Sequence, residues 1–294
     1  MSKKTDRKKA AGAESVRLDK LLAQEGFGTR SELGRAIRKG SVCVNGEHVK
    51  DPGMKVSSED EILFDGKAVR QKDHVYYMLH KPAGVVSATE DGREMTVLDL
   101  LRNPSVTGSG AAGGPEREPL SEPVLRRGLF PVGRLDKDTE GLLLITDDGQ
   151  LAHRLLSPAR HVDKTYYAIV TGKVTGEDIR AFAEGLEVDD EFTAMPARLC
   201  TDLEADAGRA ALIPGNLSGI LPGGTCQYSQ TIVTIKEGKY HQIKRMFAAR
   251  GKEVLYLKRL SMGPLYLDPA LAPGGFRPLR QEEIEALMKA DNTI

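Results

Sequence analysis

The chain has 294 residues, enough for one large domain or two, and its 42 Lys and Arg residues balance 42 Asp and Glu residues. No apolar stretch reaches membrane-spanning length, and the basic, polar segment 1–10 is followed by no apolar segment of the secretory kind. The cysteines form no CxxC pair and have no histidine at zinc-ligand spacing: Cys43, Cys200 and Cys226. We therefore expect a cytoplasmic protein with free thiols and no metal site.

The zero net charge by itself argues against nucleic-acid binding, but the charges are unevenly distributed. Residues 1–50 hold 12 Lys and Arg against 6 Asp and Glu, and residues 236–259 hold 8 against 2, so each region has a balance of +6. Two separate basic regions suit contact with RNA phosphates. Two solvated helix faces would give the same pattern, so charge alone leaves both interpretations open.

Residues 1–15 are expected to form a disordered basic arm ahead of two short helices. The leucines between Leu18 and Leu22 have helical spacing, and the helix that they predict stops at Gly26. Thr29 and Glu32 have the spacing of a capping box, which predicts the start of a second helix.

The second helix is expected to end at Gly40 and to carry a basic face. Three side chains at i, i+3 and i+4 form that face: Arg35, Arg38 and Lys39. Residues 42–49 predict a β-hairpin, because their Asn-Gly pair supplies both positive φ angles of the turn. Residues 62–64 predict one more short strand.

These elements resemble the S4 domain, an RNA-binding module of ribosomal proteins and RNA-modifying enzymes. The resemblance covers residues 16–66 and lies in the pattern RLDKLLA…G…TRSELGRAIRKGSVCVNGEHV. It implies that five residues face phosphates: Arg17, Arg30, Arg35, Arg38 and Lys39. Residues 67–73 are polar without apolar periodicity, so we expect them to be a linker.

Residues 74–294 are expected to form a second domain with strands near 75–79, 164–170 and 231–235. Short helices are expected at 151–156 and 246–249, so the fold class is α+β with a mostly antiparallel sheet. Two segments rich in Gly and Pro are expected to be surface loops, and the first could grip RNA: 102–127 and 202–225.

The segment GRLDKDTEGLLLITDDG, residues 133–149, places Asp136 in a tight, charged, Gly-bounded loop. The apolar run from Leu142 to Ile145 behind it predicts a buried strand. A carboxylate at the lip of a rigid strand suits a nucleophile or a base, because the scaffold sets its position. A structural turn and a calcium loop are the alternatives, the second because acidic residues fall near ligand positions: Asp136, Asp138, Glu140 and Asp147.

The same segment, together with KTYYAIV and EGKYHQIKRMF, resembles the pseudouridine synthases in order and spacing. The third motif and the C-terminal LYLKRLSMGPLYLDPALAPGGFRPL look like the enzymes that act on small-subunit ribosomal RNA. The resemblance implies isomerisation of uridine to pseudouridine without a cofactor, on ribosomal RNA within a small-subunit assembly intermediate. A large-subunit RNA target and a non-catalytic RNA-binding assembly factor remain alternatives. We expect a monomer.

The resemblance also implies roles for individual residues. Asp136 would be the catalytic carboxylate and Lys244 the cation that keeps it ionised near the leucines. Tyr166 would stack on the target uracil, since alternation along the strand allows only one of Tyr166 and Tyr167 to face the cleft. Arg134 would fill the gap left by the flipped base, and Arg245 would bind a phosphate. We expect Asp138 and Thr139 to brace the loop, and assign no proton transfer to His241.

Overall fold

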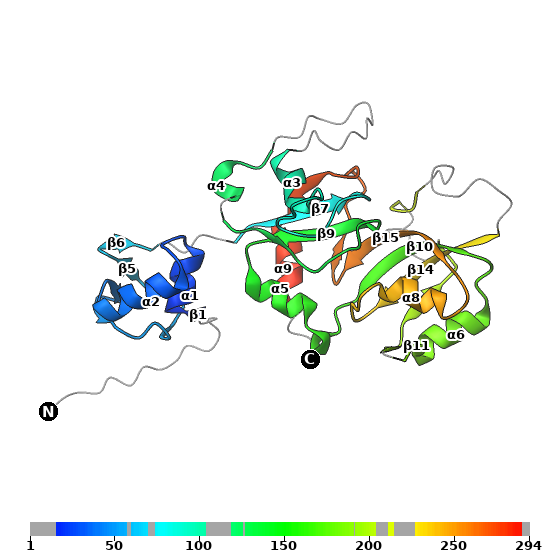
Figure 1. The fold of residues 1–294 in the computed structure, drawn as a ribbon, viewed down its shortest axis with the longest axis horizontal. Coiled ribbons are helices and arrows are strands. Elements are labelled where there is room, and N and C mark those ends of the chain that lie inside the picture. Colours follow the sequence, from blue (N-terminus) through cyan, green and yellow to red (C-terminus); the bar gives the residue numbers. More distant parts are fainter. Residues whose placement is uncertain are drawn as a thin grey trace. The chain divides into compact units, whose positions relative to one another are not determined.

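The computed structural model describes residues 16–57, 60–69, 74–103, 119–125, 127–190, 192–203, 211–214 and 227–289. Two compact units separate after Asp73, and residues 126–128 group with the N-terminal unit (Figure 1). The expected basic arm 1–15 and Cys226 lie outside the described residues, as do large parts of the two segments expected to be surface loops. No helix among the described residues is long and apolar enough to cross a membrane.

The N-terminal unit packs two helices against small antiparallel sheets. Its elements are β1 (Val16–Arg17), α1 (Leu18–Gln24), α2 (Arg30–Lys39), β2 (Val42–Val44), β3 (Glu47–Val49), β4 (Lys55–Val56), β5 (Ile62–Phe64) and β6 (Lys67–Ala68). The four-stranded sheet has the order β3-β2-β5-β6, and β1 pairs with β4. Strand β6 lies in the range expected to be a linker, so the sheet continues past residue 66.

Local sequence signals explain these elements. The expected capping box is confirmed, because the Thr29 hydroxyl accepts from the Glu32 amide at 3.4 Å and the Glu32 carboxylate accepts from the Thr29 amide at 2.9 Å. Gly40 ends α2 with a φ of 89°, and the hairpin turn has φ 51° at Asn45 and 82° at Gly46. The helices and the hairpin predicted for this unit are therefore confirmed.

The C-terminal unit is built on one nine-stranded sheet with the order β13-β14-β10-β15-β9-β7-β17, with β16 beside β15 and β8 beside β9. The strands are β7 (Tyr76–Lys81), β8 (Phe130–Pro131), β9 (Glu140–Thr146), β10 (Lys164–Thr171), β13 (Arg198–Cys200), β14 (Tyr228–Ile235), β15 (Val254–Met262), β16 (Leu265–Tyr266) and β17 (Phe276–Pro278). A separate pair consists of β11 (Leu186–Asp189) and β12 (Phe192–Ala194). Only the β9–β15 pair is parallel among the described strands, which confirms the mostly antiparallel α+β fold.

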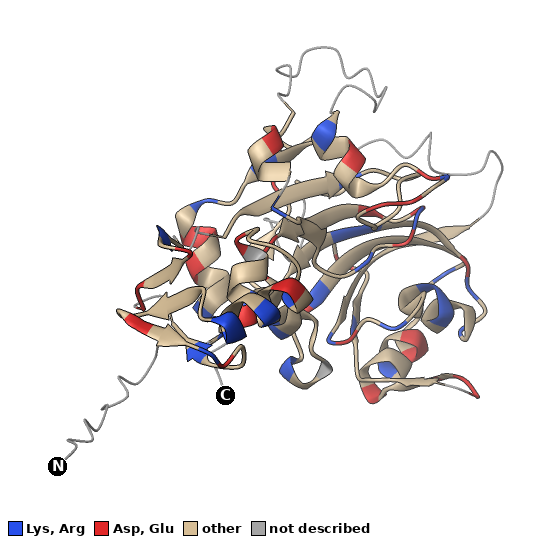
Figure 2. Ribbon diagram, turned by 60° about the vertical axis from the view of Figure 1, so that its left-hand side comes forward, with Lys and Arg blue, Asp and Glu red and all other residues tan. Residues whose placement is uncertain are grey.

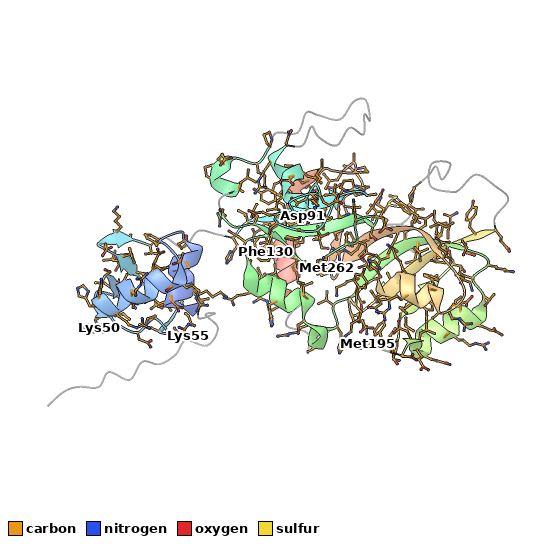
Figure 3. The ribbon with its side chains drawn as sticks, viewed as in Figure 1. Lys50, Lys55, Asp91, Phe130, Met195 and Met262 are labelled. Atoms are coloured by element: carbon orange, nitrogen blue, oxygen red, sulfur yellow. The ribbon has the colours of Figure 1, made fainter. Side chains whose placement is uncertain are left out.

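Helices cover both faces of the large sheet (Figure 1). One face packs on α3 (Val97–Arg102), α6 (Gly176–Glu184) and α8 (Gln242–Ala248), and we call the hydrophobic core between them the first core. The other face packs on α5 (Gly149–Leu156) and α9 (Gln281–Lys289), and we call the core there the second core. Strand β9 is apolar on both sides because Leu143 and Ile145 enter the first core while Leu142 and Leu144 enter the second. Phe130 and Met262, labelled in Figure 3, belong to the second core.

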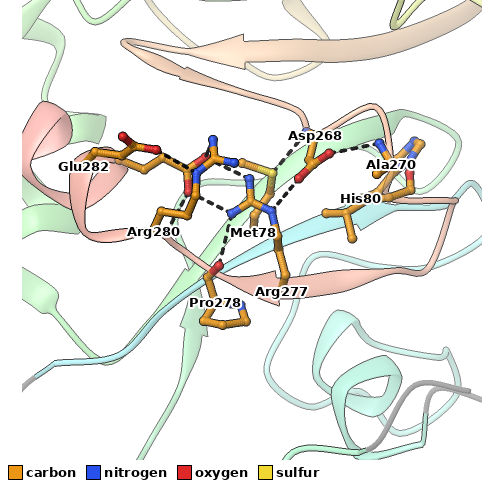
Figure 4. Close-up of polar contacts among 10 residues, drawn as sticks. Met78, His80, Asp268, Ala270, Arg277, Pro278, Arg280 and Glu282 are labelled. Atoms are coloured by element: carbon orange, nitrogen blue, oxygen red, sulfur yellow. Dashed lines mark hydrogen bonds and ion pairs between the residues drawn. The ribbon is translucent and has the colours of Figure 1, made fainter. Parts of the chain in front are cut away.

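The C-terminal segment is held to the sheet by a charged cluster around Arg277 (Figure 4). Arg277 on β17 donates to Asp268 at 2.7 Å and makes two bonds of 2.8 Å to Glu283 on α9. The Glu283 carboxylate raises the pKa of Arg277 against the opposing effect of burial. Since β17 pairs with β7, this bidentate contact fixes α9 to the edge of the sheet.

The expectation that residues 202–225 form only a surface loop is wrong at 211–214. Leu212 is buried in the core shared with α5 and α9, and its carbonyl accepts from the Lys258 ammonium at 3.1 Å. In the other long segment, 102–127, a short helix α4 (Glu122–Leu125) has no buried residue, although Val124 and Leu125 pack against the first core. Burial of the Leu212 side chain thus anchors residues 211–214 to the second core.

The two halves of the sheet meet where Gly141 on β9 pairs with Arg259 on β15. A Cβ atom on Gly141 would lie 2.2 Å from the carbonyl oxygen of Arg259 and 2.6 Å from its backbone nitrogen. Gly141 also has a φ of 108°, a conformation that favours glycine. The Arg259 side chain adds a bond of 2.7 Å from its Nε to the Leu142 carbonyl.

Replacing Gly141 with Ala should therefore strongly destabilise the protein. The added methyl group meets backbone that cannot move without breaking the β9–β15 pair, so we expect the free energy of unfolding to fall by roughly 3 kcal/mol or more. Thermal denaturation should show a Tm lower by roughly 6–12 °C. The matched variant Gly149→Ala, where nothing lies within 4 Å of the added atom, should melt like wild type. Equal melting of the two variants would contradict this account of the junction.

Candidate active site

Asp136 lies in the loop between β8 and β9, and anchors on both sides fix this loop. The Ser87 hydroxyl donates to the Leu135 carbonyl at 2.9 Å and accepts from the Leu135 amide at 3.0 Å. Leu135 is buried in the first core, and the Thr139 amide closes a turn onto the Asp136 carbonyl at 3.1 Å. The Asp136 side chain remains 26% exposed, so it is held in position and still accessible.

Lys244 on α8 lies between two carboxylates of this loop. Its ammonium is 3.2 Å from Asp136 Oδ2 and 2.6 and 2.8 Å from the two oxygens of Asp138. Burial disfavours the charged amine, but the hydrogen bonds to Asp138 and Asp136 outweigh it and raise the pKa of Lys244. Burial likewise opposes the charge of Asp138, but Lys244 outweighs it and lowers the pKa of Asp138. The structure thus brings together the carboxylate and the cation suggested by the motifs.

Tyr166 forms a wall of the pocket in front of Asp136. It is 7% exposed and faces the first core, whereas Tyr167 is fully buried in the second core. The Tyr167 hydroxyl donates to Gln230 at 2.7 Å, and burial raises the pKa of Tyr167 to about 12. Alternation along β10 therefore gives the pocket Tyr166 and leaves Tyr167 to the core.

The pocket is bounded by the Asp136 loop, β10, the end of β14, the start of α8 and Leu257 on β15. Its cavity volume is about 70 Å³. Arg134 is exposed and lines the same pocket. Among the described residues, no group of three or more His, Cys, Asp and Glu side chains is arranged to hold a metal ion.

His241 also lines the pocket, although the sequence analysis gave it no role. Its Nε2 lies 3.6 Å from Asp136 Oδ1, and its ring stacks on Tyr240 with centroids 3.8 Å apart. His241 has a φ of 49°, and Tyr240 is 76% exposed. The signal in the sequence was that His241 directly follows Tyr240 and lies three residues before Lys244.

Lys81 is the second residue of the site that the sequence analysis missed. It is fully buried, and its ammonium donates to the carbonyls of Pro82, Lys137 and Thr139 at 3.0, 3.2 and 2.9 Å. Burial lowers its pKa to about 8, against the opposing charge of Asp138. Lys81 thereby ties the end of β7 to the loop that carries Asp136, whereas the strand predicted near 75–79 gave Lys81 no role.

The residues expected to bind phosphates are in different situations. Arg245 pairs with Asp189 on β11 and lies 5.3 Å from the centre of the Phe192 ring, so its guanidinium is already engaged within the protein. In the N-terminal unit, Arg17 and Arg30 both pair with Asp19, and the hydrogen bond from Arg17 lowers the pKa of Asp19 to about 2.

The basic face of α2 is open to solvent. Its three residues are exposed, and Figure 2 colours Lys and Arg blue: Arg35, Arg38 and Lys39. The N-terminal unit therefore presents one basic helix face to solvent. Such a face suits contact with a phosphate backbone.

The structure contradicts the calcium-loop interpretation of residues 133–149. The last seven residues before Asp147 form strand β9, and Glu140 accepts from the Tyr256 hydroxyl at 2.7 Å. Asp136 and Asp138 both pair with the Lys244 ammonium, which already supplies the positive charge there. A calcium loop needs these oxygens to converge on one point.

Comparisons with known proteins agree with this architecture. The family model for RNA pseudouridylate synthase matches residues 75–249, and the S4 domain model matches residues 16–62. A Bacillus subtilis (strain 168) protein named uncharacterized RNA pseudouridine synthase YtzG is 44% identical over 273 residues, which cover 92% of this chain and 98% of that protein. Ribosomal small subunit pseudouridine synthase A of Escherichia coli (strain K12) is 36% identical over 274 residues, or 93% and 100% of the two chains.

A solved structure described as a pseudouridylate synthase is 35% identical, covers 93% of this chain and 100% of its own, and superposes with a TM-score of 0.56. The similarity therefore includes both the S4 unit and the part of the chain that contains Asp136, Tyr166 and Lys244. The chain belongs to the RNA pseudouridylate synthase family, with an S4 domain ahead of its synthase domain.

Proposed function

We propose that this protein converts a uridine of small-subunit ribosomal RNA to pseudouridine, with Asp136 as the catalytic carboxylate. The observation that carries the proposal is the Asp136–Lys244 pair at the mouth of a pocket walled by Tyr166. The named activity of the similar Escherichia coli protein supports the choice of small-subunit RNA. The S4 domain supports RNA as the substrate class.

The reaction breaks the bond between the ribose C1′ and N1 of uracil and forms a bond between C1′ and C5. C5 loses a proton and N1 regains one, so the product is an isomer and no oxidant or cofactor is consumed. Asp136 acts as an ionised carboxylate, either on the sugar C1′ or on C6 of the base. Lys244 stabilises its charge where the loop meets the apolar core.

The target base must leave its stack to reach Asp136, because Asp136 lies in a pocket that a base within a duplex cannot enter. Tyr166 packs against that ring, with its hydroxyl near C5. Arg134, exposed at the lip of the pocket, fills the space that the base leaves and stacks on neighbouring bases. Arg245 contributes a phosphate contact only where a phosphate displaces or shares its partner Asp189.

Substrate positioning relies on the S4 domain. The phosphate contacts come from the exposed face of α2 and from the two arginines that share Asp19: Arg35, Arg38, Lys39, Arg17 and Arg30. We further propose that the protein acts in the cytoplasm as a monomer, on RNA within a small-subunit assembly intermediate.

Changing Asp136 to Asn should abolish turnover and leave RNA binding almost intact, because it removes the charge and keeps the shape. The measurement is tritium release from RNA labelled at uridine C5, using small-subunit and large-subunit transcripts and a reconstituted small-subunit intermediate. We expect release only from small-subunit RNA, and none with the variant. Release from large-subunit RNA alone would overturn the substrate assignment, and full activity of the variant would overturn the catalytic one. Absence of release from every substrate would favour the non-catalytic assembly factor.

Changing Lys244 to Met should lower kcat by roughly 100-fold, because the two carboxylates lose the cation between them. Single-turnover rates at saturating RNA measure this step apart from binding. Lys173→Met, which removes an exposed Lys away from the pocket, is the matched control and should retain wild-type rates. If Lys244 serves only as a phosphate contact, the variant would instead raise KM and leave kcat unchanged.

Lys81 should contribute a pH-dependent part of the stability. Its pKa is about 8 in the folded protein and about 10.4 in an unfolded chain, so between these values the unfolded state binds more protons. The free energy of unfolding therefore gains up to roughly 3 kcal/mol from this group as the pH rises from about 8 to about 10.4. Urea unfolding of wild type and Lys81→Met across this range should show a gain that is smaller in the variant by this contribution of Lys81.

The control for this prediction is Lys164→Met. Lys164 is also buried with its pKa lowered to about 8, but it donates to the Val162 carbonyl rather than to the Asp136 loop. Both variants should lose a similar part of the pH dependence, whereas only Lys81→Met should also reduce kcat. If the free energy of unfolding of Lys81→Met depended on pH as that of wild type does, the lowered pKa of Lys81 would be contradicted.

A further inference from the structure

The face of the sheet opposite Tyr166 carries a row of polar side chains, one from each of five neighbouring strands. These side chains lie opposite one another in the strand pairing, in the order β13, β14, β10, β15 and β16. They are Arg198, Thr234, Thr165, Ser261 and Tyr266. At about 4.8 Å between strands, the row is roughly 19 Å long. We call these five residues the polar row.

The polar row lines a groove with a cavity volume of about 430 Å³. Lys236 and Asp163 border the same groove. Tyr266 is 44% exposed, and Arg198 and Lys236 are exposed as well. The groove therefore offers an accessible aromatic ring and two cations against one carboxylate.

The floor of the groove is polar, unlike the rest of this face. Thr165 and Ser261 are almost fully buried, and the hydroxyls of Thr165 and Thr234 share one hydrogen bond of 3.1 Å. Two residues further along β10 and β14 the same face is apolar, with Tyr167 and Ile232 in the second core. Hydroxyl groups on a sheet floor suit a ligand that donates and accepts hydrogen bonds.

We propose that this groove binds a single-stranded segment of the RNA substrate, several nucleotides from the target uridine. The proposal rests on the proposed function, because it takes the RNA in the Asp136 pocket as the ligand. Single-stranded RNA binds where cations meet exposed aromatic rings, since bases stack on the rings and phosphates pair with the cations. Tyr266 supplies the stacking surface, Arg198 and Lys236 the phosphate contacts, and the hydroxyls of the row the contacts to base edges.

The position of the groove fits one continuous strand. Tyr166 lines the Asp136 pocket and its neighbour Thr165 lines the groove; likewise Ile235 lines the pocket while Thr234 and Lys236 line the groove. Both sites thus lie at the same rim of the sheet, where β10 begins and β14 ends, on opposite faces. An RNA strand that crosses this rim passes the exposed Lys236 and reaches both sites.

A protein partner fits the groove less well. Protein interfaces depend on an apolar, well-packed centre from which charged groups are depleted, whereas the centre of this groove is a row of hydroxyls and two cations border it. The length of the polar row corresponds to a few stacked nucleotides at about 3.4 Å each. RNA is therefore the occupant that the chemistry favours.

The test compares RNA binding by full-length variants. The double variant Tyr266→Ala, Lys236→Ala should bind a small-subunit ribosomal transcript roughly 10-fold more weakly, and its slope of log Kd against log salt should fall by about 1. Tyr266→Phe, which keeps the ring, should bind like wild type. The matched control is Tyr228→Ala, Lys173→Ala, which removes an equally exposed Tyr and Lys elsewhere. Melting curves show whether each variant remains folded.

Turnover distinguishes the groove from the active site. The double variant should raise KM and leave kcat at saturating RNA within twofold of wild type. Binding equal to that of the control variant would overturn the proposal. Weaker binding only when ribosomal proteins are present would overturn it in favour of a protein contact. If wild type forms no pseudouridine on any RNA but the double variant still binds more weakly, the proposed function fails while the groove remains an RNA site.

Discussion

The close approach of β9 and β15 at Gly141 is the contact on which the rest of the synthase domain depends. It joins an antiparallel half made of β13, β14, β10 and β15 to another made of β9, β7 and β17, through two register pairs only. The first half carries Tyr166, and the second leads directly into the loop of Asp136. A side chain at residue 141 would separate the strands and with them the two walls of the pocket.

Charge at the active site is arranged around that junction. Lys244 reaches the loop from α8, and Lys81 holds the same loop by two of its carbonyl oxygens, those of Lys137 and Thr139. The two lysines differ in environment: carboxylates raise the pKa of Lys244, while burial lowers that of Lys81 to about 8. Lys244 thus places a positive charge beside Asp136, whereas Lys81 holds the loop in position. The difference arises because Lys244 contacts carboxylate oxygens and Lys81 contacts backbone carbonyl oxygens.

The sheet also explains how one protein could hold RNA on two faces. Side chains alternate along each strand, so neighbouring residues at the rim supply the Asp136 pocket on one side and the polar row on the other. The cores on both faces keep the sheet rigid between them. The basic face of the S4 domain lies in a separate unit with its own core.

The sequence by itself determined the local elements and the identity of the family. Capping residues, the Asn-Gly turn and the apolar run behind Asp136 act within a few residues, so their outcome was predictable for α2, the hairpin and β9. Tertiary structure decided which tyrosine faces the pocket, which carboxylates Lys244 meets and that Leu212 enters the core. Those results depend on strand register and packing between segments far apart in the chain. The contacts of Lys81 and the alignment of the polar row could not be predicted from the sequence for the same reason. Both form only when strands far apart in the chain pair with one another.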